Sequence, residues 1–320
     1  MSDEEELIVA ERLISTGQRA TGKPILLEIV RNTRSQDVKL GAILALMTCL
    51  NQLDDAELLM GLADEGVTIA QLLGQEDARA FLNAHRANLS QNEIGLPVYE
   101  KENMRLAPRW LGFALESEEK RFNELVRQIE EKEKIVSDLM GKALEFVRSS
   151  SDECLSGNIF RIAGEIYGKR YSDHKIEILR RRIGPRWLRD LVVGRTQYEN
   201  ILGPFLYRKE DRKKFEEYKS LCVRDHILAI EAFERAGDIP GKGYAYFSLA
   251  LQYRTFYEFG KAKKAVRQAR SIAEKINDAD FLWRISEIEK DIRTKNKSIP
   301  DYLAGERRPA RTSKDSPQEN

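Results

Sequence analysis

The stretch GYAYFSLALQYRTFYEFGKAKKAVRQARSIAEKI, residues 243–276, decides the fold of this chain. Its apolar residues recur with a helical period in two runs, 242–257 and 260–276, which predicts two amphipathic helices. Because the loop between them is short, the two helices should lie side by side and antiparallel. Ala250 and Ala262 are small, which suits the place where the two helices would cross closely.

The same pattern recurs elsewhere in the chain. A period of 33 residues relates the preceding helix to this stretch and pairs Ala229 with Ala262, Phe233 with Val266, and Ala236 with Ala269. A longer spacing of 87 residues pairs Phe146 with Phe233, Ile159 with Tyr246, Phe160 with Phe247, Ile162 with Leu249, Ala163 with Ala250, and Ile166 with Tyr253. The string PRWL also occurs twice, at 108–111 and 185–188. These matches predict two related units, roughly 100–182 and 177–276, that stack because neither buries its apolar stripe alone.

Residues 243–276 resemble the tetratricopeptide repeat, a helix–turn–helix of 34 residues. The seven signature positions of that family are occupied by Tyr246, Leu249, Ala250, Tyr253, Ala262, Val266 and Ala269. Glu274 replaces the usual proline near the repeat end, and the unit that begins at Ser156 lacks the alanines of the second helix. The resemblance is strong over these 34 residues, moderate over 156–276 and generic over 1–155. It implies an all-α fold in which antiparallel helix pairs stack into a right-handed superhelix.

The rest of the chain is also expected to be helical. We predict an acidic N-terminal helical domain at 1–91, a linker at 92–97, a repeat array at 98–302 and a disordered tail at 303–320. Outside 243–276, helices are expected at 4–16, 25–33, 36–52, 54–64, 67–73, 75–89, 108–116, 117–149, 156–168, 173–183, 186–202, 209–236 and 279–296.

Charge is distributed unevenly although the net charge is only +1. Residues 1–160 hold 18 basic and 28 acidic residues, whereas residues 161–320 hold 35 and 24. The most basic stretch, 161–224, offers a candidate patch for phosphates or an acidic partner; its arginines include Arg180, Arg181, Arg182, Arg186, Arg189 and Arg195. Trp187 and Tyr198 lie among them, which favours nucleic acid as an alternative ligand. Alternatively, these arginines form a solvated helix face or a surface that docks on the acidic half of the chain.

The resemblance also suggests a binding groove. Tetratricopeptide arrays bind peptides in a concave groove lined by first-helix residues, which correspond here to Tyr244, Phe247, Leu251 and Arg254. In the earlier unit the corresponding residues are Phe160 and Tyr167. Aromatic side chains beside an arginine are typical of binding hot spots. Alternatively, Phe160 and Phe247 pack against neighbouring helices.

No pattern in the sequence indicates catalysis or a cofactor. The string GQRATGK at 17–23 matches a phosphate-binding loop only formally, because Pro24 follows it and no strand precedes it. Cys222 and His226 share a helical face, but the sequence offers no second pair of metal ligands. Cys154 has no histidine partner in the sequence that would make it a nucleophile. We therefore expect no enzyme activity, no cofactor and no metal.

The start MSDEEELIVAERLIS is acidic and does not resemble a secretion signal, and the longest uncharged run, 40–53, is too short to cross a membrane. With only three separated cysteines, these features predict a soluble cytoplasmic protein with no membrane contact. The expected function is a protein–protein adaptor that binds a partner peptide or helix around 156–276. A nucleic-acid-binding or regulatory protein is the alternative, and a homodimer that joins the acidic and basic halves also remains open.

Overall fold

The computed structural model describes residues 2–15, 18–49, 55–106, 116–182 and 207–294. All regular structure in these ranges is helical. The helices are α1 (Asp3–Ser15), α2 (Arg19–Asn32), α3 (Gln36–Cys49), α4 (Ala56–Leu73), α5 (Glu76–Leu106), α6 (Glu116–Ser149), α7 (Glu153–Arg182), α10 (Lys209–Ala236), α11 (Ile239–Thr255), α12 (Phe259–Ile276) and α13 (Ala279–Thr294). Residues 108–115 of the first expected helix after the linker, the expected helix 186–202 and the tail 303–320 lie outside the described residues.

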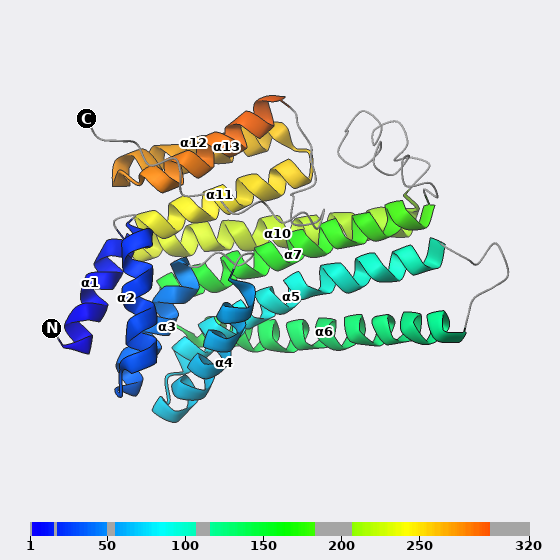
Figure 1. Cartoon of the computed structure of the whole chain (residues 1–320). Coiled ribbons are helices and arrows are strands. Elements are labelled where there is room, and N and C mark those ends of the chain that lie inside the picture. Colours follow the sequence, from blue (N-terminus) through cyan, green and yellow to red (C-terminus); the bar gives the residue numbers. More distant parts are fainter. Residues whose placement is uncertain (1, 16–17, 50–54, 107–115, 183–206, 295–320) are drawn as a thin grey trace, which may run out of the picture.

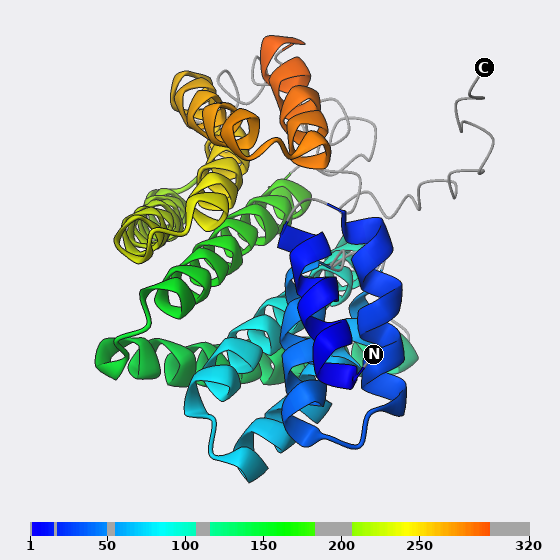
Figure 2. The same ribbon diagram turned by 90° about the vertical axis from the view of Figure 1, so that its left-hand side faces the viewer.

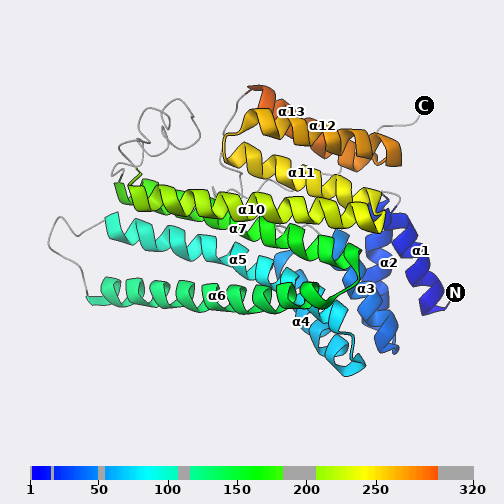
Figure 3. The same cartoon turned by 180° about the vertical axis from the view of Figure 1, so that it is seen from behind.

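The long helices form a layered stack. Contacts run from α6 to α5, then through α7, α10, α11 and α12 to α13, and Figure 1 shows these helices side by side in that order. The shorter helices α1–α4 run across one end of the stack, as the reverse view in Figure 3 also shows. The all-α class, with sequential helices packed against each other, is therefore confirmed.

The helix pair predicted from residues 243–276 is present as α11 and α12. Ala250 and Ala262 are both fully buried in the core cluster that these two helices share with α13. Helix α10 ends at Ala236 and is capped by Gly237, whose φ of 70° lies in the left-handed region that favours glycine. The Asp238 side chain then accepts a hydrogen bond of 2.8 Å from the Gly241 N–H and so caps the start of α11.

Three predicted helix breaks are wrong. Residues 54–64 and 67–73 belong to the single helix α4, because Gly66 is a packing glycine rather than a breaker. A Cβ at Gly66 would lie 2.9 Å from Leu82 Cδ1 and 3.0 Å from Ile43 Cγ2. The glycine thus lets α4 approach α3 and α5 closely.

The second wrong break separated residues 156–168 from 173–183, which form the continuous helix α7. The predicted gap at 169–172 is helical in the structure, and side chains in and beside it meet partners on other helices. Asp173 is buried and accepts a hydrogen bond from Gln91 on α5, while the Tyr171 ring packs against Phe256 after α11. Polar partners therefore allow this segment to remain helical within the stack.

The third error is the linker at 92–97, which lies inside α5 with Pro97 in the helix interior. Ile94 and Val98 are buried against α6 and α7 on either side of the proline. Their burial offsets a helix-interior proline cost of about 3 kcal/mol. The predicted boundary at residue 91 thus falls within a helix that contributes to two core clusters.

None of the described helices combines the length and apolar character needed to cross a lipid bilayer.

Candidate binding cavity

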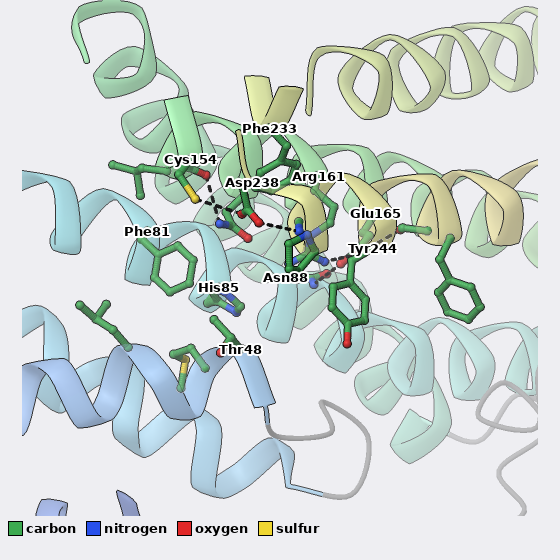
Figure 4. Close-up of a pocket in the computed structure, with 18 of the residues that line it drawn as sticks. Thr48, Phe81, His85, Asn88, Cys154, Arg161, Glu165, Phe233, Asp238 and Tyr244 are labelled. Carbon is green, nitrogen blue, oxygen red and sulfur yellow. Dashed lines mark hydrogen bonds and ion pairs between the residues drawn. The ribbon is translucent and has the colours of Figure 1, made fainter. Parts of the chain in front are cut away.

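A cavity of about 1130 Å³ lies between the N-terminal helices and the C-terminal end of the stack. Its walls come from α1 and α3 on one side, α5 and α7 in the middle, and α10 to α13 on the other side. Figure 2 shows α7 between the α1–α4 group and the α11–α13 group. We call this space the central cavity, and Figure 4 shows part of its lining.

Tyr244, Phe247, Leu251 and Arg254 line the central cavity. Their spacing places them on one face of α11. Part of this face is also held by α13, because the Tyr244 and Phe247 rings lie 4.3 and 5.5 Å from the ring of Phe281. The α11 face therefore packs against a neighbouring helix and borders the cavity at the same time.

Polar contacts orient the two ends of this face. The Tyr244 hydroxyl donates to Asp278 Oδ2 at 3.0 Å, and Arg254 forms an ion pair of 3.1 Å with Asp291. Arg254 is therefore already paired with α13 and is not a free cation for a carboxylate ligand.

Phe160 and Tyr167 are not among the residues that line the cavity. Phe160 packs against two core clusters, and the Arg170 guanidinium lies 5.9 Å from the Tyr167 ring. Helix α7 instead presents polar side chains to the cavity, including Arg161 and Glu165. The structure thus brings together the four α11 residues and separates the two α7 residues from them.

Glu165 is the centre of a polar cluster that joins α5, α7 and α11. Its carboxylate receives the Arg161 guanidinium at 2.6 Å and the Asn88 side-chain N–H at 3.2 Å. The Ser248 hydroxyl lies 3.1 Å from the same carboxylate. Figure 4 shows Asn88, Arg161 and Glu165 gathered beside Tyr244. Arg161 is therefore neutralised within the protein.

His226 extends this cluster to α10. Its Nδ1 lies 2.8 Å from the Cys222 carbonyl, and its Nε2 lies 2.9 Å from the Ser248 hydroxyl. Burial lowers the pKa of His226, although the Cys222 carbonyl and Glu165 oppose this shift. Because a carbonyl only accepts, Nδ1 carries a proton and donates to the Cys222 carbonyl, while the Ser248 hydroxyl, which lies beside Nε2, donates its single proton to Glu165. The cluster thus mainly holds helices α5, α7, α10 and α11 together.

His85, on α5, is a cavity residue that the sequence analysis did not identify as a candidate site residue. It is 2% exposed, it lines the cavity, and its Nε2 has no hydrogen-bond partner. Burial, followed by the charge of Arg161, lowers the pKa of His85 to about 3. The Phe81 ring lies 4.5 Å from the imidazole. A lone histidine gives no periodic signal, and its burial depends on how α3 and α7 cover α5.

Cys154 and Cys222 are the cysteines whose side chains the structure describes. The Cys154 thiol donates to Asp238 Oδ2 at 3.1 Å, and burial, with this carboxylate, raises the pKa of Cys154 to about 12. Burial also raises the pKa of Cys222 well above its usual value, so both thiols stay protonated. No group of three or more histidine, cysteine or acidic side chains suited to a metal occurs in the ranges that the structure describes.

The basic patch lies beyond what the structure describes. Arg180, Arg181 and Arg182 belong to the end of α7, but their side chains are not described, and Arg186, Arg189 and Arg195 fall in residues 183–206.

Residues 19–23 of the string GQRATGK belong to α2, and the Lys23 ammonium lies 3.2 Å from the Asp55 carboxylate. Its lysine is therefore engaged in an ion pair.

Comparison with known proteins found no protein-family model and no curated protein that matches this chain.

Proposed function

We propose that this protein is a non-enzymatic adaptor that binds a segment of a partner protein in the central cavity, within a tetratricopeptide-like array. The observation that carries this proposal is the α11 face, where Tyr244, Phe247 and Leu251 border a cavity of about 1130 Å³. Small-molecule pockets commonly measure about 300–1,000 Å³. The central cavity therefore has room for several residues of a peptide.

Amide side chains support a peptide as the ligand. Asn92, Asn158 and Gln252 line the cavity from three different helices. A carboxamide carries a donor and an acceptor, which matches the N–H and C=O of a peptide unit. Trp283 on α13 adds a half-exposed aromatic ring at the cavity wall. Such a mixture of aromatic and amide groups is suited to an uncharged backbone with apolar side chains.

The charges around the cavity favour a neutral or basic partner. Six acidic and four basic side chains line it: Glu11, Asp77, Asp152, Glu165, Asp238 and Asp278 against Arg161, Lys169, Arg254 and Arg284. An excess of carboxylates repels the phosphates of a nucleic acid. The basic stretch 161–224 keeps nucleic acid as a sequence-based alternative for another surface.

We also propose a cytoplasmic location, which the two free cysteines Cys154 and Cys222 support.

Selection from a random peptide library, followed by fluorescence anisotropy at physiological and high salt, tests the adaptor function. Leu251→Lys places a charge at the cavity wall, and Ile227→Lys makes the same kind of change on α10 at a residue that is 42% exposed and outside the lining. We expect micromolar binding that Leu251→Lys weakens at least about tenfold, that Ile227→Lys leaves unchanged, and that salt barely affects. Failure to select any peptide, or equal loss in both variants, would contradict the proposal.

A further inference from the structure

The outer face of helix α12 is strongly basic. The helix carries six lysine or arginine side chains and a single acidic one, Glu274. Its apolar side chains are turned toward α11 and α13, which lie beside it near the outer edge of the stack (Figure 2). The exposed residues of the helix are Gly260, Lys261, Lys263, Lys264, Arg267, Gln268, Ser271, Glu274 and Lys275. Helix α12 therefore presents positive charge to solvent and no exposed apolar side chain.

Carboxylates of the protein compensate only part of this charge. Lys261 pairs with Glu258 at 3.0 Å, and Arg270 pairs with Glu289 of α13 at 2.8 Å. The other four basic side chains have no ion pair with any residue that the structure describes: Lys263, Lys264, Arg267 and Lys275. We call these four side chains the α12 basic ridge.

The ridge is straight and continuous. At about 100° per residue, its four members fall within an arc of about 120° on one side of α12. At a rise of about 1.5 Å per residue, the ridge extends about 18 Å from Lys263 to Lys275. A DNA duplex carries one phosphate about every 3.4 Å along each strand, so about five phosphates of one strand match this length. Each of the four cations can therefore face a different phosphate.

The lack of exposed apolar groups on α12 distinguishes between anionic partners. An acidic protein partner usually needs an apolar centre in its interface, and a membrane-surface helix needs an exposed apolar face. Single-stranded nucleic acid is bound largely by stacking of its bases on aromatic side chains. The outer face of α12 offers none of these groups. A duplex keeps its bases stacked inside and offers only its phosphates, which is the chemistry that this face matches.

We propose that the α12 basic ridge binds the phosphate backbone of double-stranded DNA without reading its sequence. This activity goes beyond the adaptor function, because Ile276 is the one residue of α12 that lines the central cavity. The ridge and the cavity are thus separate surfaces. The chain can hold a partner segment in one and a duplex on the other.

Fluorescence anisotropy of the full chain with two labelled duplexes of unrelated sequence tests this inference. We expect micromolar affinity at about 50 mM salt and equal affinity for the two sequences. For four phosphate contacts, the logarithm of the binding constant should fall against the logarithm of the salt concentration with a slope of about −3.6. Raising the salt from about 50 to 200 mM should therefore weaken binding about 100-fold.

The variant Lys263→Gln/Lys264→Gln/Arg267→Gln should reduce the slope to about −1, because each lost phosphate contact removes about one unit. All three side chains are exposed, so the fold should be unaffected. The matched control is the α6 variant Lys134→Gln/Lys142→Gln/Arg148→Gln, which also removes two lysines and one arginine that are exposed. It should keep the wild-type affinity and slope.

Absence of binding at about 50 mM salt would overturn the inference. A slope that the α12 variant leaves unchanged would place the DNA contact elsewhere, such as the basic stretch 161–224, and would also overturn it. So would an equal loss in the α6 variant. Tighter binding of a single strand of the same length, or of anionic lipid vesicles, would assign the ridge to another partner. If wild type self-associates and only the α12 variant is monomeric, the ridge docks on a second copy instead.

Discussion

Replacing His85 by phenylalanine should make the protein less sensitive to acid. His85 has a pKa of about 3 in the folded chain, compared with an ordinary value of 6.5 in the unfolded chain. Its folded pKa is depressed, so the unfolded state takes up a proton first as the pH falls below 6.5. Stability that is fully present above pH 6.5 is then lost progressively as the pH falls toward 3.

The size of this effect follows from the two pKa values. Between pH 7 and pH 5, protonation of His85 in the unfolded chain alone lowers the free energy of unfolding by about 2 kcal/mol. His85→Phe removes that term, so the stability difference between the variant and wild type should grow by about 2 kcal/mol from pH 7 to pH 5. At pH 7 itself the variant should be more stable by about 1 kcal/mol, because the benefit of removing an unpaired buried polar group is partly offset by the strain of the larger ring.

Urea denaturation followed by circular dichroism at pH 7, 6 and 5 measures these differences. Ile227→Ala keeps all three histidines and should follow the wild-type dependence on pH. If His85→Phe and wild type lose stability in parallel between pH 7 and pH 5, the reasoning about the buried neutral imidazole is refuted.

Four other substitutions have expected outcomes. Gly164→Ala should destabilise the protein by about 1–3 kcal/mol, because the added Cβ would overlap the His226 imidazole and lie 3.1 Å from the Cys222 carbonyl. A Cβ at Gly141 would meet nothing within 4 Å, so Gly141→Ala should stabilise α6 by about 0.5–1 kcal/mol in the same urea titration. Ser248→Ala should cost about 1–3 kcal/mol, because it removes the buried hydroxyl that lies 2.9 Å from His226 Nε2 and donates to Glu165; an unchanged urea midpoint would contradict this. Asp238→Asn should lower the raised pKa of Cys154, so thiol labelling at pH 8 should proceed faster than in wild type; equal rates would disprove the assigned cause.

The helices and their order could largely be predicted from the sequence, because each long helix buries an apolar stripe with a helical period. The errors arose at residues with ambiguous roles. Gly66 reads as a breaker in isolation, and only the neighbouring Ile43 and Leu82 reveal that it allows close packing. Pro97 likewise suggests an end to α5, and the packing of the flanking residues keeps the helix intact.

Residue spacing predicted only part of the cavity lining. The α11 face follows from spacing, since Tyr244 and Leu251 lie on one side of the helix. Phe160 was assigned by analogy with Phe247, but α7 contacts helices on two sides of the stack. An aromatic residue on such a central helix is taken up by the core, whereas α11 lies nearer the end of the stack and keeps a face toward the cavity.

The arrangement of the cavity also bears on how binding and folding are connected. Helices α1–α4 make their main contacts with one another and with α5. The central cavity is bordered by α3 on one side and by α11 on the other, so a segment that reaches from α3 to α11 touches both groups. Such a ligand binds the assembled chain better than a chain in which α1–α4 have separated. The proposed partner would therefore stabilise the N-terminal helices against the stack as well as occupy the cavity.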